Sequence, residues 1–330
     1  GSDVDLDWTV RFFLGLVHRR DGSERNGAAA LYRLLLDDPL RRAGPQIRSL
    51  VIVPGGPLHR VPFGALRKGV DQEPLAASYE ISFTPSASVW TRLRESSARP
   101  AGGVVSLADP ALPASDGHAS GQRDVGSFAD VMDLAPLPRA RHEARAVVRA
   151  LGKPSLLAEG SEASEHLLKS SEIARHGVLH LAVHAVIDEA HPRRSSLVLA
   201  PGNEDEDGLV QMREIVDLPL DGKIVILSAC SSASGPMVAG EGVMGLARSF
   251  FQAGATAVLG SLWPLRDDEA EAFTSRFAGF LGDGKTVGEA LALTRRESIR
   301  DGAPTSAWAG LVALGNADHR VGSAEPTNPD

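Results

Sequence analysis

The fold is decided by residues 223–235, Lys223-Ile-Val-Ile-Leu-Ser-Ala-Cys230-Ser-Ser-Ala-Ser-Gly235. The first half is a run of aliphatic residues, which is typical of a strand buried on both faces of a parallel sheet. The run ends near the thiol of Cys230, and small polar residues follow. Ligands and catalytic groups gather at the carboxyl ends of parallel strands, so this thiol is a candidate nucleophile. A lone cysteine is more often a buried apolar residue, and position alone does not decide between the two interpretations.

A second apolar run also ends in a polar side chain, at residues Gly177-Val-Leu-His180-Leu-Ala-Val-His184-Ala185. Side chains alternate along a strand, so His180 and His184 are predicted on one face, with His184 nearer the end. A cysteine nucleophile needs an imidazole that takes its proton and later protonates the leaving amine. Two neighbouring strands that end in His184 and Cys230 would supply this dyad. A single histidine at a strand end is more often structural, but the joint pattern favours catalysis.

On both sides of these two strands, apolar runs alternate with helical patterns along the chain. This alternation predicts an α/β protein with a mainly parallel central sheet. Strands are predicted at 49–53, 80–83, 103–108, 178–183, 196–200, 223–228, 256–262 and 311–314. Helices are predicted at 27–37, 86–95, 139–151, 162–169, 241–252, 267–281 and 287–300. Residues 109–135 lack periodicity and are predicted to form a long surface loop open to nicking, and 201–208 a solvated acidic hairpin tip.

Composition limits the classes of protein that remain. The chain has 330 residues, enough for two domains or one enlarged domain, and 34 Lys and Arg against 42 Asp and Glu give a net charge of −8. This charge argues against nucleic acid as a partner. No apolar run is long enough for a membrane span and no secretory leader opens the chain, so a cytoplasmic location is expected. The single cysteine excludes an internal disulfide and a multi-cysteine zinc site.

A series of motifs along the chain resembles the CHAT-domain family of caspase-like cysteine peptidases, which belongs to the same clan as the caspases and separase. The similar blocks occur in order over roughly residues 30–315: Leu50-Val-Ile-Val-Pro-Gly-Gly-Pro-Leu-His-Arg-Val-Pro-Phe-Gly-Ala-Leu66, Pro85-Ser86, Leu137-Pro-Arg-Ala140 with Glu143, the His184 strand, Ser196-Leu-Val-Leu199, Leu227-Ser-Ala-Cys230, Gly240-Glu-Gly-Val-Met-Gly-Leu-Ala247, Gly254-Ala255, Ser261-Leu-Trp-Pro264 with Asp267, and Trp308 before Gly315. So many blocks in one order are more specific than any single motif.

The resemblance implies a caspase-like α/β/α sandwich preceded by a degenerate caspase-like half. It divides the chain into a non-catalytic half at 3–100 and a catalytic half at 101–315. Residues 316–330 have no apolar pattern and are predicted to form a disordered tail. It implies His184 as general base, Cys230 as nucleophile, and the backbone N–H groups of Ala185 and Cys230 as the oxyanion hole. The chain departs from the family pattern at Ala185, where glycine is usual, and at Ser231-Ser232. If Ala185 had to adopt a positive φ, it would be strained.

Four further residues are candidates for lining or supporting the pocket. His180 shares the strand of His184, and Asp188 follows closely enough to orient its imidazole or to lie in a solvated loop. Glu241 is expected either to line the pocket or to favour a helix N-terminus. Asp267 matches a family position, although capping its own helix is the preferred interpretation.

Three other interpretations of these residues compete with a peptidase. Gly240-Glu-Gly242-Val-Met-Gly245 fits a dinucleotide-binding pattern, but its first glycine does not directly follow a strand as that fingerprint requires. A zinc ion held by His180, His184, His191 and Cys230 lacks a specific spacing. A catalytically impaired scaffold that binds partner proteins is favoured by Ala185 and disfavoured by the retention of His184 and Cys230. No metal and no cofactor is therefore expected.

The resemblance implies a cysteine endopeptidase that cleaves a specific partner protein at one or few sites. Its expected setting is bacterial defence or regulated cell death. The expected substrate is a gasdermin-like pore former or a CRISPR-associated protein encoded nearby. An activating protein, or self-processing within 109–135, is expected to regulate it.

Overall fold

The computed structural model describes residues 5–95, 102–112, 134, 137–186, 195–228, 230–231 and 241–322, with the backbone alone described at 230–231 and 241–244. The helices are α1 (Leu6–Arg19), α2 (Arg25–Leu35), α3 (Asp37–Ala43), α4 (Ala87–Glu95), α6 (Pro138–Leu151), α7 (Glu165–Lys169), α8 (Met212–Ile215), α9 (Glu241–Gln252), α10 (Asp267–Gly282) and α11 (Val287–Arg300). The strands are β1 (Ser49–Ile52), β2 (Glu80–Phe83), β3 (Val104–Pro110), β4 (Ser155–Gly160), β5 (Val178–Ala182), β6 (His184–Val186), β7 (Ser196–Val198), β8 (Leu209–Gln211), β9 (Ile224–Leu227), β10 (Cys230–Ser231), β11 (Ala257–Ser261) and β12 (Leu311–Gly315).

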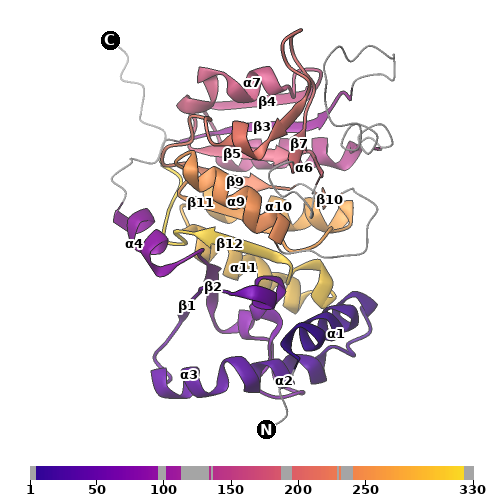
Figure 1. Ribbon diagram of the computed structural model, residues 1–330, viewed down its shortest axis with the longest axis vertical. Helices are drawn as coiled ribbons and strands as arrows, with labels where there is room; N and C mark the ends of the chain where they lie inside the picture. Colours follow the sequence, from indigo (N-terminus) through magenta and orange to yellow (C-terminus); the bar gives the residue numbers. More distant parts are fainter. Residues whose placement is uncertain are drawn as a thin grey trace.

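An eight-stranded sheet in the order β1-β2-β12-β11-β9-β5-β3-β4 runs through the molecule (Figure 1). Its neighbours pair in parallel except β11 and β12, which are antiparallel. The predicted α/β class with a mainly parallel sheet is therefore confirmed. Strands from both sides of residue 100 lie in this one sheet, and one apolar cluster includes residues of both parts; the boundary between the halves remains a prediction.

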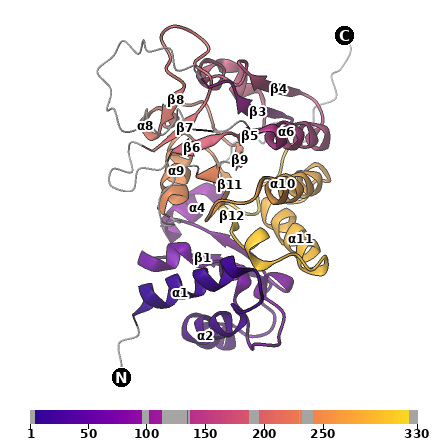
Figure 2. The ribbon, with the colours of Figure 1, turned by 90° about the vertical axis from the view of Figure 1, so that its right-hand side faces the viewer.

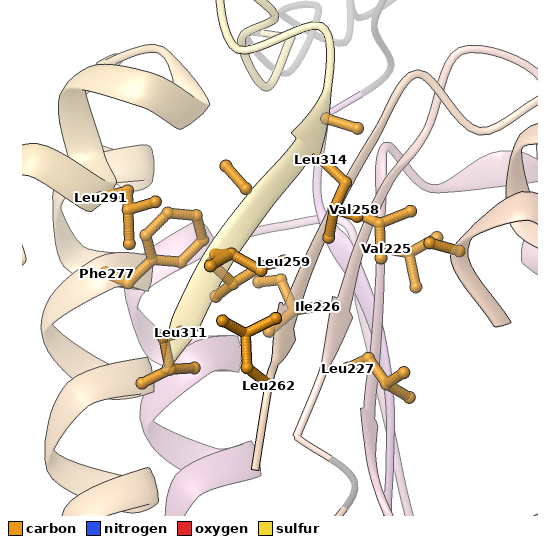
Figure 3. Packing of buried hydrophobic residues seen from close by; sticks show 14 of the residues in the cluster. Val225, Ile226, Leu227, Val258, Leu259, Leu262, Phe277, Leu291, Leu311 and Leu314 are labelled. Carbon is orange, nitrogen blue, oxygen red and sulfur yellow. The ribbon is translucent and has the colours of Figure 1, made fainter. Parts of the chain in front are cut away.

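Helices cover both faces of the main sheet. Figure 2 shows α6, α10 and α11 in a row on one face, with α9 on the other. The central strands β3, β5 and β9 are buried along their whole length, which explains why their sequences are mostly apolar. In Figure 3, Phe277 of α10 and Leu291 of α11 project towards β12. Each such side chain contributes about 1.5–3 kcal/mol when fully buried, so this layer fixes the helices against the sheet.

A second, four-stranded sheet has the order β10-β6-β7-β8. It continues from the main sheet, because β5 passes through a bend at Val183 into β6. Strands β7 and β8 form an antiparallel hairpin, while β6 and β10 pair in parallel. The small sheet is thus an extension of the carboxyl edge at which the sequence predicted the site.

The residues after β12 extend the ordered structure beyond the predicted start of the tail. The backbone N–H groups of Val287 and Gly288 donate to the carbonyls of His319 and Ala317, at 3.0 and 2.8 Å. His319 also contacts the Gly222 carbonyl through Nε2 at 2.8 Å. Residues 316–319, which the sequence analysis assigned to a disordered tail, therefore pack on the N-terminus of α11. The remainder of that tail, from residue 323, lies outside the described residues.

Candidate functional site

His184 and Cys230 are register partners in the small sheet. Strands β6 and β10 pair in parallel with Cys230 opposite His184 and Ser231 opposite Ala185. Adjacent strands lie about 4.8 Å apart, so the two candidate catalytic residues occupy neighbouring backbone positions. His184 is 6% exposed, and its imidazole is enclosed by the protein. For Cys230 the structure describes the backbone alone.

The alignment of these residues continues a register that begins in the main sheet. There β5 pairs with β9 so that Val178 lies opposite Ile224 and Leu181 opposite Leu227. The same offset in residue number relates His184 to Cys230. The backbone N–H of Ser228 donates to the Leu181 carbonyl at 3.0 Å, which extends the pairing beyond the last residue of β9. The pairing of two buried strands therefore determines which residue faces His184.

Ala185 lies inside β6 and is 3% exposed. Among the described residues, Arg20 and Asp109 alone have positive φ without being glycine. Ala185 is therefore in ordinary extended backbone, and the strain considered for this departure from glycine is absent. An alanine at this position is compatible with the local fold.

A chain of buried polar side chains lies below the strand end that carries His184. His180 of β5 is within hydrogen-bond distance of Ser106 of β3 (Oγ to Nδ1, 2.8 Å) and of Glu143 of α6 (Oε1 to Nε2, 2.9 Å). All three residues are buried, at most 3% exposed. Of the two roles considered for His180, its burial fits support of the site rather than lining an open pocket. Ser106 was not predicted as a site residue, although a serine in an otherwise apolar strand was a usable signal.

The remaining predicted site residues are not brought together by the described structure. Asp188 lies outside the described residues, and Glu241 is the first residue of α9, its side chain likewise outside them. Asp267 is exposed in the first turn of α10, where a negative charge is favourable. It does not cap the helix, because Arg266 occupies the N-cap position and no side chain caps it. Its preferred interpretation as a cap is therefore corrected to a first-turn charge.

Asp109 is the penultimate residue of β3, although a loop was predicted from residue 109 onward. Its backbone is left-handed, with φ of 45°, a conformation that Asp adopts more readily than most residues. Its carboxylate accepts hydrogen bonds from the Leu137 N–H at 2.7 Å and from Arg141 Nε at 2.6 Å. Leu137 is the N-cap residue of α6, so Asp109 fixes the start of that helix to the sheet. Self-processing was predicted within 109–135, and residues 113–133 and 135 of that segment lie outside the described residues.

Four charged residues, Lys169, Glu165, Glu206 and Glu214, join the small sheet to helices α7 and α8 and are termed here the Lys169 cluster. Lys169 Nζ donates to Glu165 at 2.7 Å, Glu206 at 2.9 Å and Glu214 at 3.0 Å. Burial raises the pKa of Glu165, and its hydrogen bonds from Lys169 and the Gly208 N–H offset this only in part. Partial burial opposes the charge on Lys169, but the three carboxylates outweigh it and raise the pKa of the ammonium.

The Lys169 cluster also revises the prediction for the acidic loop 201–208. The hairpin between β7 and β8 is confirmed. Glu206, however, does not project into solvent as predicted for this loop, because it bonds Lys169 at the end of α7. The cluster therefore joins the hairpin to α7 and α8, and β7 of that hairpin is paired with the His184 strand.

Among the residues that the structure describes, no group of three or more His, Cys, Asp or Glu is arranged to hold a metal ion. No helix in the described part of the chain is both long and apolar enough to cross a bilayer. Gly242 and Gly245, from the dinucleotide-like pattern, lie within helix α9.

The fold and the adjoining strand ends define a caspase-like α/β protein. The solved structure of the Arg specific cysteine proteinase gingipain R superposes with a TM-score of 0.53 over 92% of this chain and 69% of that chain, at 9% identity. At that identity the likeness concerns the fold alone. Separase of Saccharomyces cerevisiae, in its complex with securin, matches 84% of this chain and 16% of that chain with a TM-score of 0.45 and 17% identity.

The CHAT domain model matches residues 25–316, and the chain belongs to the CHAT domain family. Tetratricopeptide repeat protein 28 of Mus musculus is 25% identical over 361 residues, which cover 91% of this chain and 14% of that protein. Its counterpart in Homo sapiens is 26% identical over 357 residues, which cover 91% and 13%. The chain thus spans about one-seventh of the length of these relatives.

Proposed function

We propose that this protein is a cysteine endopeptidase in which His184 is the general base and Cys230 the nucleophile. The observation that carries the proposal is the pairing of His184 with Cys230 on adjacent parallel strands. Membership of the CHAT family, whose members are often cysteine peptidases, supports the same chemistry. Cys230 is the single thiol of the chain, so any thiol chemistry must use it.

The mechanism follows from the roles of the two side chains. His184 takes the thiol proton, and the thiolate of Cys230 attacks the carbonyl carbon of the scissile peptide bond. The carbonyl oxygen becomes an oxyanion, for which the backbone N–H groups of Ala185 and Cys230 are the proposed donors. The protonated imidazole then gives its proton to the leaving amine, and the C–N bond breaks. Water, deprotonated by His184, hydrolyses the thioester and restores the thiol.

The proposed substrate is a partner protein cleaved at one or few sites. The family resemblance favours a role in bacterial defence or regulated cell death, with a gasdermin-like or CRISPR-associated protein as the target and an activating protein as regulator. Within the proposal, His180 supports the site, and Asp188 and Glu241 stay secondary candidates for it. The chain needs no metal or cofactor for this chemistry.

Alkylation of the single thiol tests the proposed dyad without a known substrate. Iodoacetamide should add one mass equivalent, and its rate at pH 7 should fall about tenfold in His184→Ala, because the thiol loses the neighbouring base that lowers its pKa. Equal rates in the wild type and His184→Ala would contradict the dyad.

Proteolysis is tested in a lysate that supplies candidate substrates. New protein N-termini, labelled chemically after incubation with the wild type, should be absent after incubation with Cys230→Ala. Identical sets of N-termini for the two proteins would contradict the peptidase and favour the alternative of a catalytically impaired scaffold that binds partner proteins.

A further inference from the structure

A hydrogen-bonded chain of three side chains, termed here the His180 chain, crosses the interior of the protein. It consists of Ser106, His180 and Glu143, with contacts of 2.8 Å and 2.9 Å on the two ring nitrogens of His180. Ser106 and His180 are fully buried and Glu143 is 3% exposed. A carboxylate only accepts hydrogen bonds, so Nε2 of His180 donates to Glu143, and Ser106 completes the chain at Nδ1. Both nitrogens of the imidazole are therefore occupied.

The cost of this arrangement suggests that it does more than fill space. Three apolar side chains of similar size would pack in the same place without the loss of hydration that polar groups suffer on burial. A buried polar network in which every group has a partner instead favours one arrangement of the surrounding strands and helices over other arrangements.

The His180 chain fixes β5 from two sides. Ser106 and His180 are register partners on β3 and β5, so their bond marks one alignment of these strands. Glu143 fixes the same residue of β5 to helix α6. Glu143 can reach His180 because small side chains let α6 lie close to the strands: Ala108 and Ala182 of the strands pack against Ala144 of α6. The start of α6 is itself anchored to β3 through Asp109.

His184 lies four residues after His180, where β5 continues through the bend at Val183 into β6. The offset between β5 and β9 is preserved between His184 and Cys230, so a shift of β5 along its axis would bring His184 beside a different residue. A slip of a single residue would also reverse the face of every side chain. The chain that leads from β9 to Cys230 is also fixed to a helix. The hydroxyl oxygen of Ser228, the residue after β9, lies 3.1 Å from that of Thr274 in α10.

We propose that Glu143, His180 and Ser106 are positioning residues, which hold the β5 strand so that His184 stays aligned with Cys230. The proposal rests on the proposed function, since it concerns the same dyad. None of the three contacts substrate in this scheme. They act through the backbone that joins His180 to His184.

The test measures the rate at which iodoacetamide alkylates the single thiol as a function of pH. In Glu143→Ala, the Nε2 group of His180 loses its partner, and we expect the alkylation rate at pH 7 to fall about tenfold. The midpoint of the pH profile should move towards the ordinary thiol value of about 8.5. Glu143→Gln keeps an acceptor oxygen of the same reach and should restore most of the rate, while Ser106→Ala should fall between them.

Arg145→Ala is the matched control on the same helix. Arg145 binds Glu159 of β4 through two bonds of 2.9 and 2.8 Å and is half exposed, so its loss removes a contact between α6 and a strand without touching His180. Circular dichroism and a thermal melt establish which variants are folded, and Ser106→Ala decides the matter if Glu143→Ala is not. Wild-type profiles in folded Glu143→Ala and Ser106→Ala, or an equal loss in Arg145→Ala, would overturn the inference.

His184→Ala separates this inference from the proposed function. If His184→Ala slows alkylation while Ser106→Ala and both Glu143 variants leave it unchanged, the dyad stands and the positioning role fails. If His184→Ala itself has no effect, the dyad fails.

Discussion

Replacement of Lys169 by methionine removes the one cation of the Lys169 cluster and leaves three carboxylates facing each other. The side chain of Glu165 is 2% exposed and bonds Lys169 at 2.7 Å; a hydrogen bond to a charged group of this kind is worth about 2 kcal/mol. Glu206 and Glu214 are partly exposed, and each contributes about 0.5 kcal/mol. Lys169→Met should therefore lower the free energy of unfolding by about 3 kcal/mol at pH 7.5.

The loss of stability in Lys169→Met should increase with pH. Burial already raises the pKa of Glu165, while hydrogen bonding to Lys169 opposes that rise and helps to lower the pKa of Glu206. Without Lys169, both groups bind protons more tightly in the folded state than in the unfolded state. Stability of the variant then falls as pH rises through and above the ordinary carboxyl value of about 4.3. The difference from the wild type should be smaller at pH 5 than at pH 7.5.

Urea unfolding followed by circular dichroism at the two pH values measures this difference. Arg41→Met is the control, because Arg41 binds Asp38 at 2.6 Å but both side chains are largely exposed. Its loss should leave the free energy of unfolding close to the wild-type value at either pH, because water screens an exposed ion pair. A change below about 1 kcal/mol for Lys169→Met at pH 7.5, or an equal change at both pH values, would refute the reasoning.

Three further outcomes are expected. Ala185→Gly should give no gain in cleavage rate, since Ala185 is unstrained, and should cost about 1–2 kcal/mol through backbone entropy and one lost buried methyl group; a tenfold faster cleavage of the same protein would contradict this. Gly310→Ala should destabilise the protein by about 2 kcal/mol in urea, because its Cβ would lie 2.5 Å from the buried ring of Trp263, whereas Gly15→Ala meets nothing within 4 Å and should be neutral or stabilising. Exhaustive chelation should leave proteolysis unchanged, and loss of activity restored by zinc would show that a metal is required.

The sequence was sufficient for those parts of the fold whose pattern is local. Helices α9 and α11 and strand β2 have the predicted bounds, and β5 and β9 differ from prediction by one residue at one or both ends. Helix α1 was missed although its buried residues Val10, Phe13 and Val17 follow helical spacing. Strands β6 and β10 have three and two residues, too few for periodicity to be recognised.

The candidate site was likewise predictable only where its signals are local in the sequence. His184 and Cys230 were identified from the ends of apolar runs, which is local information. That they share a register could not be read from the sequence, because pairing depends on packing between strands far apart in the chain. Ser106 stands out locally as a serine in an otherwise apolar strand, but its partner His180 could not be predicted from the sequence, and Glu143 was part of a recognised motif whose role depends on the position of α6 over β5.

The constant register across both sheets makes two short connections equal in length. The path from Leu181 to His184 has the same number of residues as the path from Leu227 to Cys230. An insertion in one path alone would separate the dyad, whereas equal insertions in both would carry His184 and Cys230 outward together. Among relatives of this chain, length changes in these two connections should therefore be inherited as a pair, and a relative with only one of them changed should have lost the chemistry even if it keeps both residues.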